Sequence, residues 1–165
     1  MKRRPNDLIL ALFLCAVSFA ACGGGENNNA RTNANAANRT GEGSIAAKTN
    51  VEELSLLVNV PYEAEDIVWK DYTAGKKVIA VLRFSPEDAN KVAASAEKYG
   101  APENVGLPVE TWFPDELIAQ GEMSGDRALK GLAYSANDFY LTPYTSGKIT
   151  RIEASDYFVL EVSAP

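Results

Sequence analysis

A low-complexity stretch from residue 23 to residue 50 most constrains how this chain of 165 residues can fold. It reads GGGENNNARTNANAANRTGEGSIAAKTN, and it holds no aromatic residue and a single large aliphatic side chain, Ile45. Such a stretch buries too little apolar surface to offset the conformational entropy lost on ordering, so it is expected to form a disordered tether. One folded domain is therefore expected over residues 51–165, a length that suits a single core.

The residues ahead of this stretch carry the pattern of a secretion signal. Met1 is followed by three cations, Lys2, Arg3 and Arg4, and residues 8–21 contain no charge. This apolar run suits the central part of a signal peptide and falls short of the roughly 20 residues that a lasting transmembrane helix needs. The basic flank is expected to stay in the cytoplasm, so the rest of the chain is expected to cross the membrane.

The end of the apolar run reads Phe19-Ala20-Ala21-Cys22. It resembles the lipobox of bacterial lipoproteins, although Phe19 stands where leucine is usual. The resemblance implies that residues 1–21 are removed, that Cys22 receives a thioether-linked diacylglycerol, and that its amine is acylated. Two or three acyl chains anchor a protein stably. The chain is thus expected in the cell envelope, with residues 22–50 tethering the domain to a membrane.

Two other interpretations of the same residues remain open. The segment Ser18-Phe19-Ala20 also fits ordinary signal peptidase cleavage, which would release a soluble protein with an unmodified Cys22. Alternatively, the apolar run stays uncut and serves as a membrane anchor.

Composition excludes several kinds of chemistry. The chain has no histidine, and once the leader with Cys15 is removed its sole cysteine is Cys22. Nucleophilic and zinc-dependent mechanisms therefore lack their usual base and ligands, and no phosphate-binding or dinucleotide fingerprint is present. We expect no catalytic residues, no metal site and no cofactor. Residues 51–165 hold 10 Lys and Arg against 19 Asp and Glu, a net charge of −9 that argues against nucleic-acid binding.

The domain is predicted to be α+β, with an antiparallel sheet of about five strands and one main and one short helix packed on one face. Residues 66–72 and 78–84 predict a hairpin. Ser85, Pro86 and Asp88 give a strong helix start, and the small apolar residues that follow predict a helix over 86–99, ended by Gly100. Residues 101–111 are expected to be a loop, and residues 121–131 to be polar and exposed. The remaining predicted elements are a short helix at 113–119 and strands at 139–141, 149–153 and 157–162.

Aromatic residues supply the candidate binding site. Trp69 and Trp112 could form a stacking platform for glycans or a hydrophobic anchor for a partner, and Phe113 adjoins the second indole. The alternative for each tryptophan is packing in the core. The scattered carboxylates, such as Asp115 and Glu116 at the start of the short helix, are assigned structural roles.

The sequence thus favours a non-enzymatic interaction module held at the membrane by the lipid on Cys22, with an envelope protein or the cell-wall polymer as partner. Two alternatives belong to other classes. One is a small hydrolase that acts on envelope glycans or peptides through carboxylates, and the other is a secreted enzyme inhibitor whose acidic surface suits a basic target.

Overall fold

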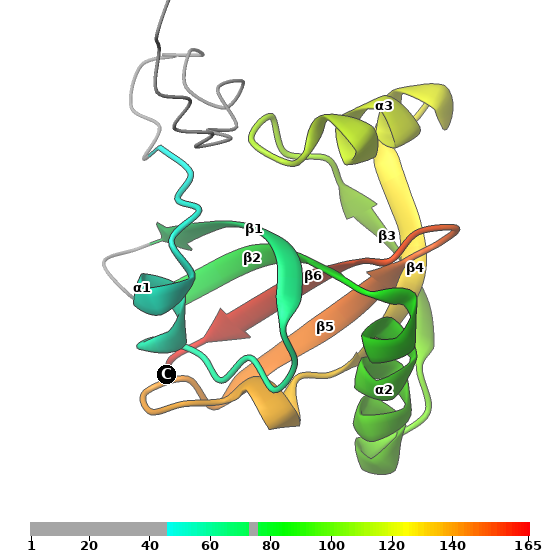
Figure 1. Ribbon diagram of the computed structural model, residues 1–165. Coiled ribbons are helices and arrows are strands. Elements are labelled where there is room, and N and C mark those ends of the chain that lie inside the picture. Colours follow the sequence, from blue (N-terminus) through cyan, green and yellow to red (C-terminus); the bar gives the residue numbers. More distant parts are fainter. Residues whose placement is uncertain (1–45, 73–75) are drawn as a thin grey trace, which may run out of the picture. The chain divides into compact units, whose positions relative to one another are not determined.

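The computed structural model describes residues 46–72 and 76–165 (Figure 1). Cys22, the expected signal sequence and nearly all of the expected tether lie outside these ranges. The described elements, including the short 3-10 helices η1 and η2, are α1 (Val51–Ser55), β1 (Ala64–Tyr72), β2 (Lys77–Phe84), α2 (Pro86–Ala96), η1 (Glu97–Tyr99), β3 (Glu103–Pro108), α3 (Asp115–Met123), β4 (Ala128–Ser135), η2 (Asn137–Phe139), β5 (Ser146–Ile152) and β6 (Tyr157–Ser163).

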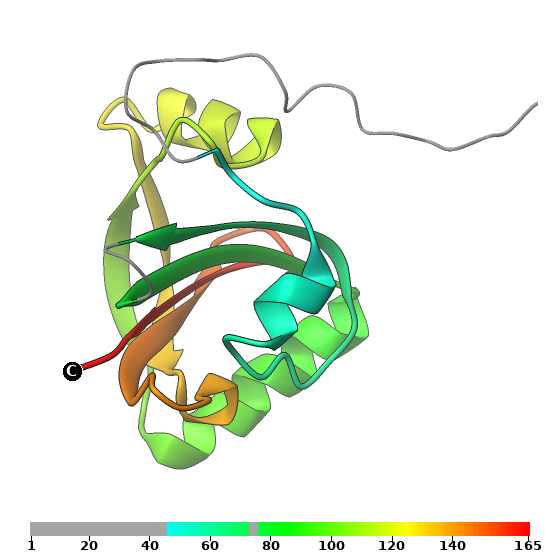
Figure 2. The ribbon, with the colours of Figure 1, turned by 90° about the vertical axis from the view of Figure 1, so that its left-hand side faces the viewer.

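The strands form one six-stranded sheet in the order β1-β2-β6-β5-β4-β3, and every neighbouring pair is antiparallel. The last strand, β6, lies between β2 and β5, and it joins the hairpin β1–β2 to the consecutive strands β3, β4 and β5. The sheet is strongly curved, as Figure 2 shows. The α+β class is therefore confirmed, with one strand more than the sequence predicted.

Both faces of the sheet are covered by apolar packing. In β2, Val78 and Leu82 belong to a core cluster with α1, α2 and η2, whereas Ile79 and Val81 belong to a second cluster with α3. Central strands covered on both sides are expected to be continuously apolar, and β2 and β6 are buried along nearly their whole lengths. The expectation that both helices pack on one face is wrong, because α2 and α3 cover opposite faces.

Helix α2 begins as its sequence indicates. The Ser85 hydroxyl accepts a hydrogen bond from the Asp88 backbone N–H at 3.1 Å, and Pro86 occupies the first turn. The apolar face of α2 consists of alanines and one valine, and all four are buried against the sheet. The predicted helix over 86–99 is thus confirmed as α2 followed by η1.

Several predictions between residues 101 and 141 were wrong. The expected loop at 101–111 contains strand β3, and the stretch expected to be exposed at 121–131 contains the start of β4. Residues 139–141 are not a strand, because η2 ends at Phe139 and the two residues that follow belong to no helix or strand. The short helix begins two residues later than predicted and ends at Met123. Strand β3 was missed because it is a short edge strand with proline, glycine and polar residues.

Asp138 in η2 links the connection between β4 and β5 to α2 and η1 through hydrogen bonds. Its carboxylate accepts hydrogen bonds from the Ser95 hydroxyl and the Tyr99 hydroxyl, both at 2.6 Å. Its backbone carbonyl accepts from the side-chain amide of Asn59, also at 2.6 Å. One residue thus connects η2 to α2, to η1 and to the segment after α1.

Two glycines on neighbouring strands make a matched test of packing. A Cβ at Gly131 in β4 would collide with the Arg151 carbonyl and lie 2.9 Å from the Thr150 methyl group, whereas a Cβ at Gly106 in β3 would meet nothing within 4 Å. Gly131→Ala is therefore expected to lower the free energy of unfolding by about 1–3 kcal/mol, and Gly106→Ala to change it by less than about 0.5 kcal/mol. Urea denaturation measures both, and equal effects would contradict this packing.

Asp138→Asn is expected to lower the free energy of unfolding by about 1 kcal/mol at neutral pH. The Ser95 hydroxyl, and then the Tyr99 hydroxyl, lower the pKa of Asp138 below its ordinary value of 3.8. The stability that the carboxylate contributes is therefore full above the unfolded-state pKa and is lost as the pH falls through the lower folded-state pKa. Urea denaturation should show the difference between wild type and variant shrinking below about pH 4. A difference unchanged down to about pH 2 would refute the role of the charge.

Candidate functional site

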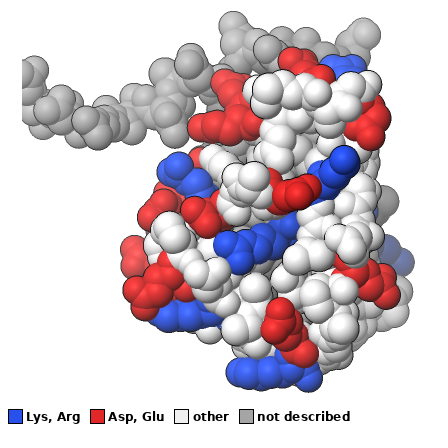
Figure 3. Space-filling view, turned by 90° about the vertical axis from the view of Figure 1, so that its right-hand side faces the viewer, with Lys and Arg blue, Asp and Glu red and all other residues white. Residues whose placement is uncertain are grey.

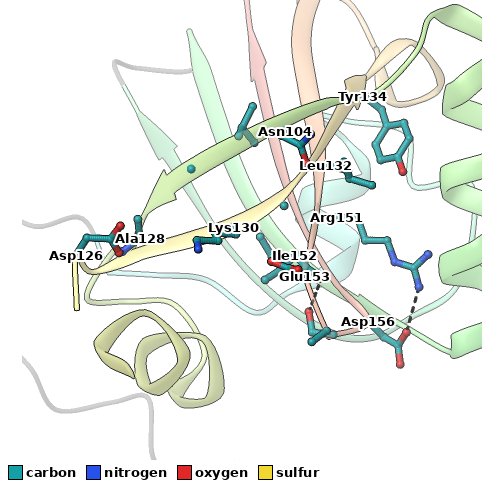
Figure 4. Close-up of a pocket in the computed structure, with 15 residues that line it drawn as sticks. Asn104, Asp126, Ala128, Lys130, Leu132, Tyr134, Arg151, Ile152, Glu153 and Asp156 are labelled. Carbon is teal, nitrogen blue, oxygen red and sulfur yellow. Dashed lines mark hydrogen bonds and ion pairs between the residues drawn. The ribbon is translucent and has the colours of Figure 1, made fainter. Parts of the chain in front are cut away.

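A groove of about 850 Å³ lies over β3, β4 and the end of β5 (Figure 4). We call it the β3–β5 groove. The β5–β6 turn closes one side, and Figure 3 looks onto the face of the molecule toward which this turn projects. The groove is lined by Asn104, Val105, Gly106, Asp126, Ala128, Lys130, Gly131, Leu132, Tyr134, Arg151, Ile152, Glu153, Ala154, Ser155 and Asp156.

The strand register places the lining side chains in two rows across the sheet. Asn104 pairs with Leu132, which pairs with Arg151. In the next row Gly106 pairs with Lys130, and the Lys130 carbonyl accepts a hydrogen bond from the Glu153 N–H at 2.9 Å. Side chains opposite one another in neighbouring strands point to the same face, so each row crosses the floor of the groove.

Arg151 forms the wall of the groove on the side of α2. Its Nη1 donates to the Asn90 side chain at 3.0 Å, and its Nη2 lies 3.7 Å from an Asp156 carboxylate oxygen. The guanidinium also lies 5.8 Å from the ring centroid of Phe158. These contacts hold Arg151 in place, so it shapes the groove rather than offering an uncommitted charge.

Three exposed side chains lie on the floor of the groove, those of Asn104, Lys130 and Leu132. Leu132 is 37% exposed, which is high for a leucine in the middle of a sheet. The Lys130 side chain makes no hydrogen bond or ion pair with residues 46–72 or 76–165, and its charge contributes least among the causes that lower the pKa of Asp126. The floor therefore presents one apolar and one cationic contact to a ligand.

Acidic residues stand at the rim, as the red side chains around the central blue ones in Figure 3 illustrate. The Ser124 hydroxyl and then the Ala128 N–H hydrogen bond to Asp126 and lower its pKa. The pKa values of Asp88, Asp126 and Asp138 are all lowered. A carboxylic acid that donates a proton near neutral pH needs a raised pKa. Asp126 is therefore suited to binding rather than to general-acid chemistry.

The structure does not bring the two tryptophans together. Trp69 in β1 is 1% exposed and packs in the core on the α1 and α2 side. Its Nε1 donates to the Asn50 carbonyl at 3.1 Å, and the Lys48 ammonium lies 4.6 Å from its ring centroid. In this structure the indole presents almost no surface to a ligand.

Trp112 packs against the core cluster on the opposite face of the sheet and is half-buried. Its Nε1 donates to the Tyr72 hydroxyl at 3.1 Å, and Phe113 meets it edge-on at 4.8 Å between ring centroids. The Lys70 ammonium lies 5.5 Å from its ring centroid. Burial raises the pKa of Tyr72 despite the hydrogen bond from Trp112. Phe113 is buried, so a binding role for this pair remains a prediction that depends on the exposed part of Trp112.

The residues of the β3–β5 groove were missed by reasoning from sequence. Asn104 lies in a stretch that was expected to be a loop, Lys130 lies in one that was expected to be polar and exposed, and Leu132 was assigned to no element. Burial alternates only over residues 128–132, where Leu129 and Gly131 are buried and their neighbours are less so, and Tyr134 is buried on the opposite face. So short an alternation is a weak signal for a strand.

Within residues 46–72 and 76–165, no cluster of three or more acidic, histidine or cysteine side chains could hold a metal ion. None of the helices in these ranges has the length and apolar character needed to cross a membrane.

Comparison with known proteins identifies no family for this chain. No protein-family model, no curated protein and no solved structure matches the chain. A function for this chain must therefore be argued from the β3–β5 groove and from the amino-terminal sequence.

Proposed function

We propose that this chain is a lipid-anchored cell-envelope protein whose domain binds another envelope component in the β3–β5 groove, without catalysing a reaction. The partner is another envelope protein or the cell-wall polymer. The observation that carries the proposal is the groove floor, where Leu132 and Lys130 stand exposed side by side on an ordered sheet.

The anchoring half of the proposal depends on the residues at the amino terminus. The basic residues 2–4, the uncharged run 8–21 and the small residues before Cys22 together fit lipoprotein export. The tether expected over residues 23–50, treated as a Gly-rich coil, would have a root-mean-square span of about 30 Å. The domain would therefore search for its partner close to the membrane surface.

The binding half depends on the chemistry of the groove. A ligand-binding groove combines apolar surface with a few polar groups that fix orientation. Here Leu132 and Tyr134 supply apolar surface, and Lys130 supplies the polar group. Asp126, an acid at the rim, has a lowered pKa, so it is poorly suited to the general-acid step of carboxylate-dependent hydrolysis.

Replacement of the lipidated cysteine tests the anchor. Cys22→Ala is expected to abolish the acyl mass and to move the protein from the membrane fraction to the soluble or unprocessed fraction, because a single thiol carries the diacylglycerol. Intact-mass analysis and membrane fractionation measure both effects, and Cys15→Ala is the matched control. A wild-type protein whose mature amino terminus is Cys22 without lipid mass would refute the anchor.

Photo-crosslinking in intact cells tests the groove. A photoreactive amino acid at position 132 is expected to give an adduct with an envelope component, because that side chain lies on the groove floor. The same amino acid at position 56 is the control, since Leu56 is 79% exposed and lies in no part of the groove. Equal adduct yields at the two positions, or none at position 132, would contradict binding in the groove.

A further inference from the structure

One edge of the sheet is open beside the groove. Strand β3 ends the sheet order, and among the described residues its backbone is paired with β4 alone. The Val109 N–H donates to the Arg127 carbonyl at 3.1 Å, and this pair continues the register of β3 and β4. Hydrogen-bonded pairs alternate along an antiparallel ladder, so the odd-numbered residues of β3 bond to β4. The backbone groups of Asn104, Gly106 and Pro108 therefore point outward.

The opposite edge of the sheet, strand β1, is partly covered. At β1, Lys48 and Trp69 exchange two backbone hydrogen bonds, of 2.8 and 2.9 Å, in an isolated antiparallel bridge. A segment of the same chain thus already occupies the middle of that edge. Unpaired strand edges invite pairing with another chain, and proteins usually cover or interrupt them. Within the described residues, β3 is left available where β1 is covered.

Gly106 leaves a notch between this open edge and the groove floor. A Cβ at Gly106 would meet no atom within 4 Å, and Lys130 is directly opposite Gly106 in the ladder. A residue paired with Gly106 from outside would have its Cα about 10 Å from that of Lys130, since two pair spacings separate them. The combined length of a lysine and an acidic side chain spans that distance. A carboxylate at that position could therefore pair with Lys130 across the glycine.

The neighbouring row favours a different side chain. A residue paired with Asn104 from outside lies in line with Leu132, whose exposed surface is the apolar part of the floor. An aliphatic side chain in that place would extend over Asn104 toward Leu132 and remove apolar surface from water.

We infer that an extended segment of a partner protein adds to the sheet antiparallel to β3, with an acidic residue opposite Gly106 and an aliphatic residue opposite Asn104. The inference depends on the proposed function and names its partner class. Main-chain bonds to Asn104 and Gly106 supply the affinity, and the groove selects the side chains. A second copy of this chain fits less well. Pairing centred on Val105 would place Asn104 opposite Gly106, and two domains of charge −9 repel.

Synthetic strands test the inference directly. The probe is acetyl-Thr-Val-Thr-Asp-Thr-Val-Thr-amide, in which Asp falls opposite Gly106 and the second Val opposite Asn104. The probe is expected to bind the purified protein. Binding is expected to slow hydrogen exchange at the backbone amides of Asn104 and Gly106, which NMR measures. A probe N-methylated at those two residues loses two backbone donors and is expected to bind at least about tenfold more weakly. A probe with Lys in place of Asp is expected to bind several-fold more weakly.

Two variants locate the interaction on the protein. Gly106→Pro removes an outward N–H without removing a bond to β4, so the fold is expected to persist, as its thermal melting would show, while probe binding is lost. Lys130→Met is expected to remove the preference for the Asp probe over the Lys probe. Lys148→Met is its control, because Lys148 pairs with Glu161 away from the groove. Failure of all probes to bind at millimolar concentration, or binding unaffected by N-methylation and by Gly106→Pro, would overturn strand addition.

The cellular crosslink separates this inference from the proposed function. Adduct formation at position 132 that disappears in Gly106→Pro supports strand addition. An adduct that persists in Gly106→Pro, or one that is degraded by a muramidase and not by a protease, overturns strand addition while groove binding stands. Absence of any adduct at position 132 overturns the proposed function itself.

Discussion

The pairing of β2 with β6 is the interaction on which the rest of the domain depends. It joins the amino-terminal hairpin to the carboxy-terminal strands across a long separation in sequence, and the two strands pair over seven residues. Phe84 and Phe158, near the ends of these strands, meet edge to face at 5.6 Å between centroids. Because both faces of this central pair are covered, β2 and β6 are apolar over most of their lengths. The sheet is therefore complete only when β6, the last strand in the sequence, has paired with β2 and β5.

The groove follows from where the covering helices stop. Helix α2 packs through small alanine side chains, which brings it close to the sheet, and its contacts reach as far as Tyr134. Beyond that residue the same face of β4 carries Leu132 and Lys130 without a helix above them. Arg151 marks the boundary, because Asn90 on α2 binds one side of its guanidinium and Asp156 the other. The exposed floor is therefore the part of this face that α2 does not cover.

How much of this was predictable depends on how local the physical signal is. Helix α2 was predictable because Ser85, Pro86 and Asp88 specify a helix start within four residues. The hairpin β1–β2 was predictable because both strands are rich in β-branched and aromatic residues. Strand β3 was not, since an edge strand with Gly106 and Pro108 is specified by its pairing with β4. Because neither β3 nor β4 was predicted, the groove residues were not recognised as a site. The aromatic candidates Trp69 and Trp112 pack on opposite faces of the sheet.

An open edge on an acidic domain requires some protection against self-association, and β3 carries features that give it. Pro108 removes one outward donor, and Glu103 places a charge at the other end of the strand, so only the middle of the edge offers complete pairs. The net charge of the domain further opposes the approach of another copy. Because of these features, the residues of the edge that can pair fully with another strand are Asn104 and Gly106, beside the groove floor. An incoming strand is therefore held to the register in which its side chains meet Leu132 and Lys130, which makes the edge selective rather than merely adhesive.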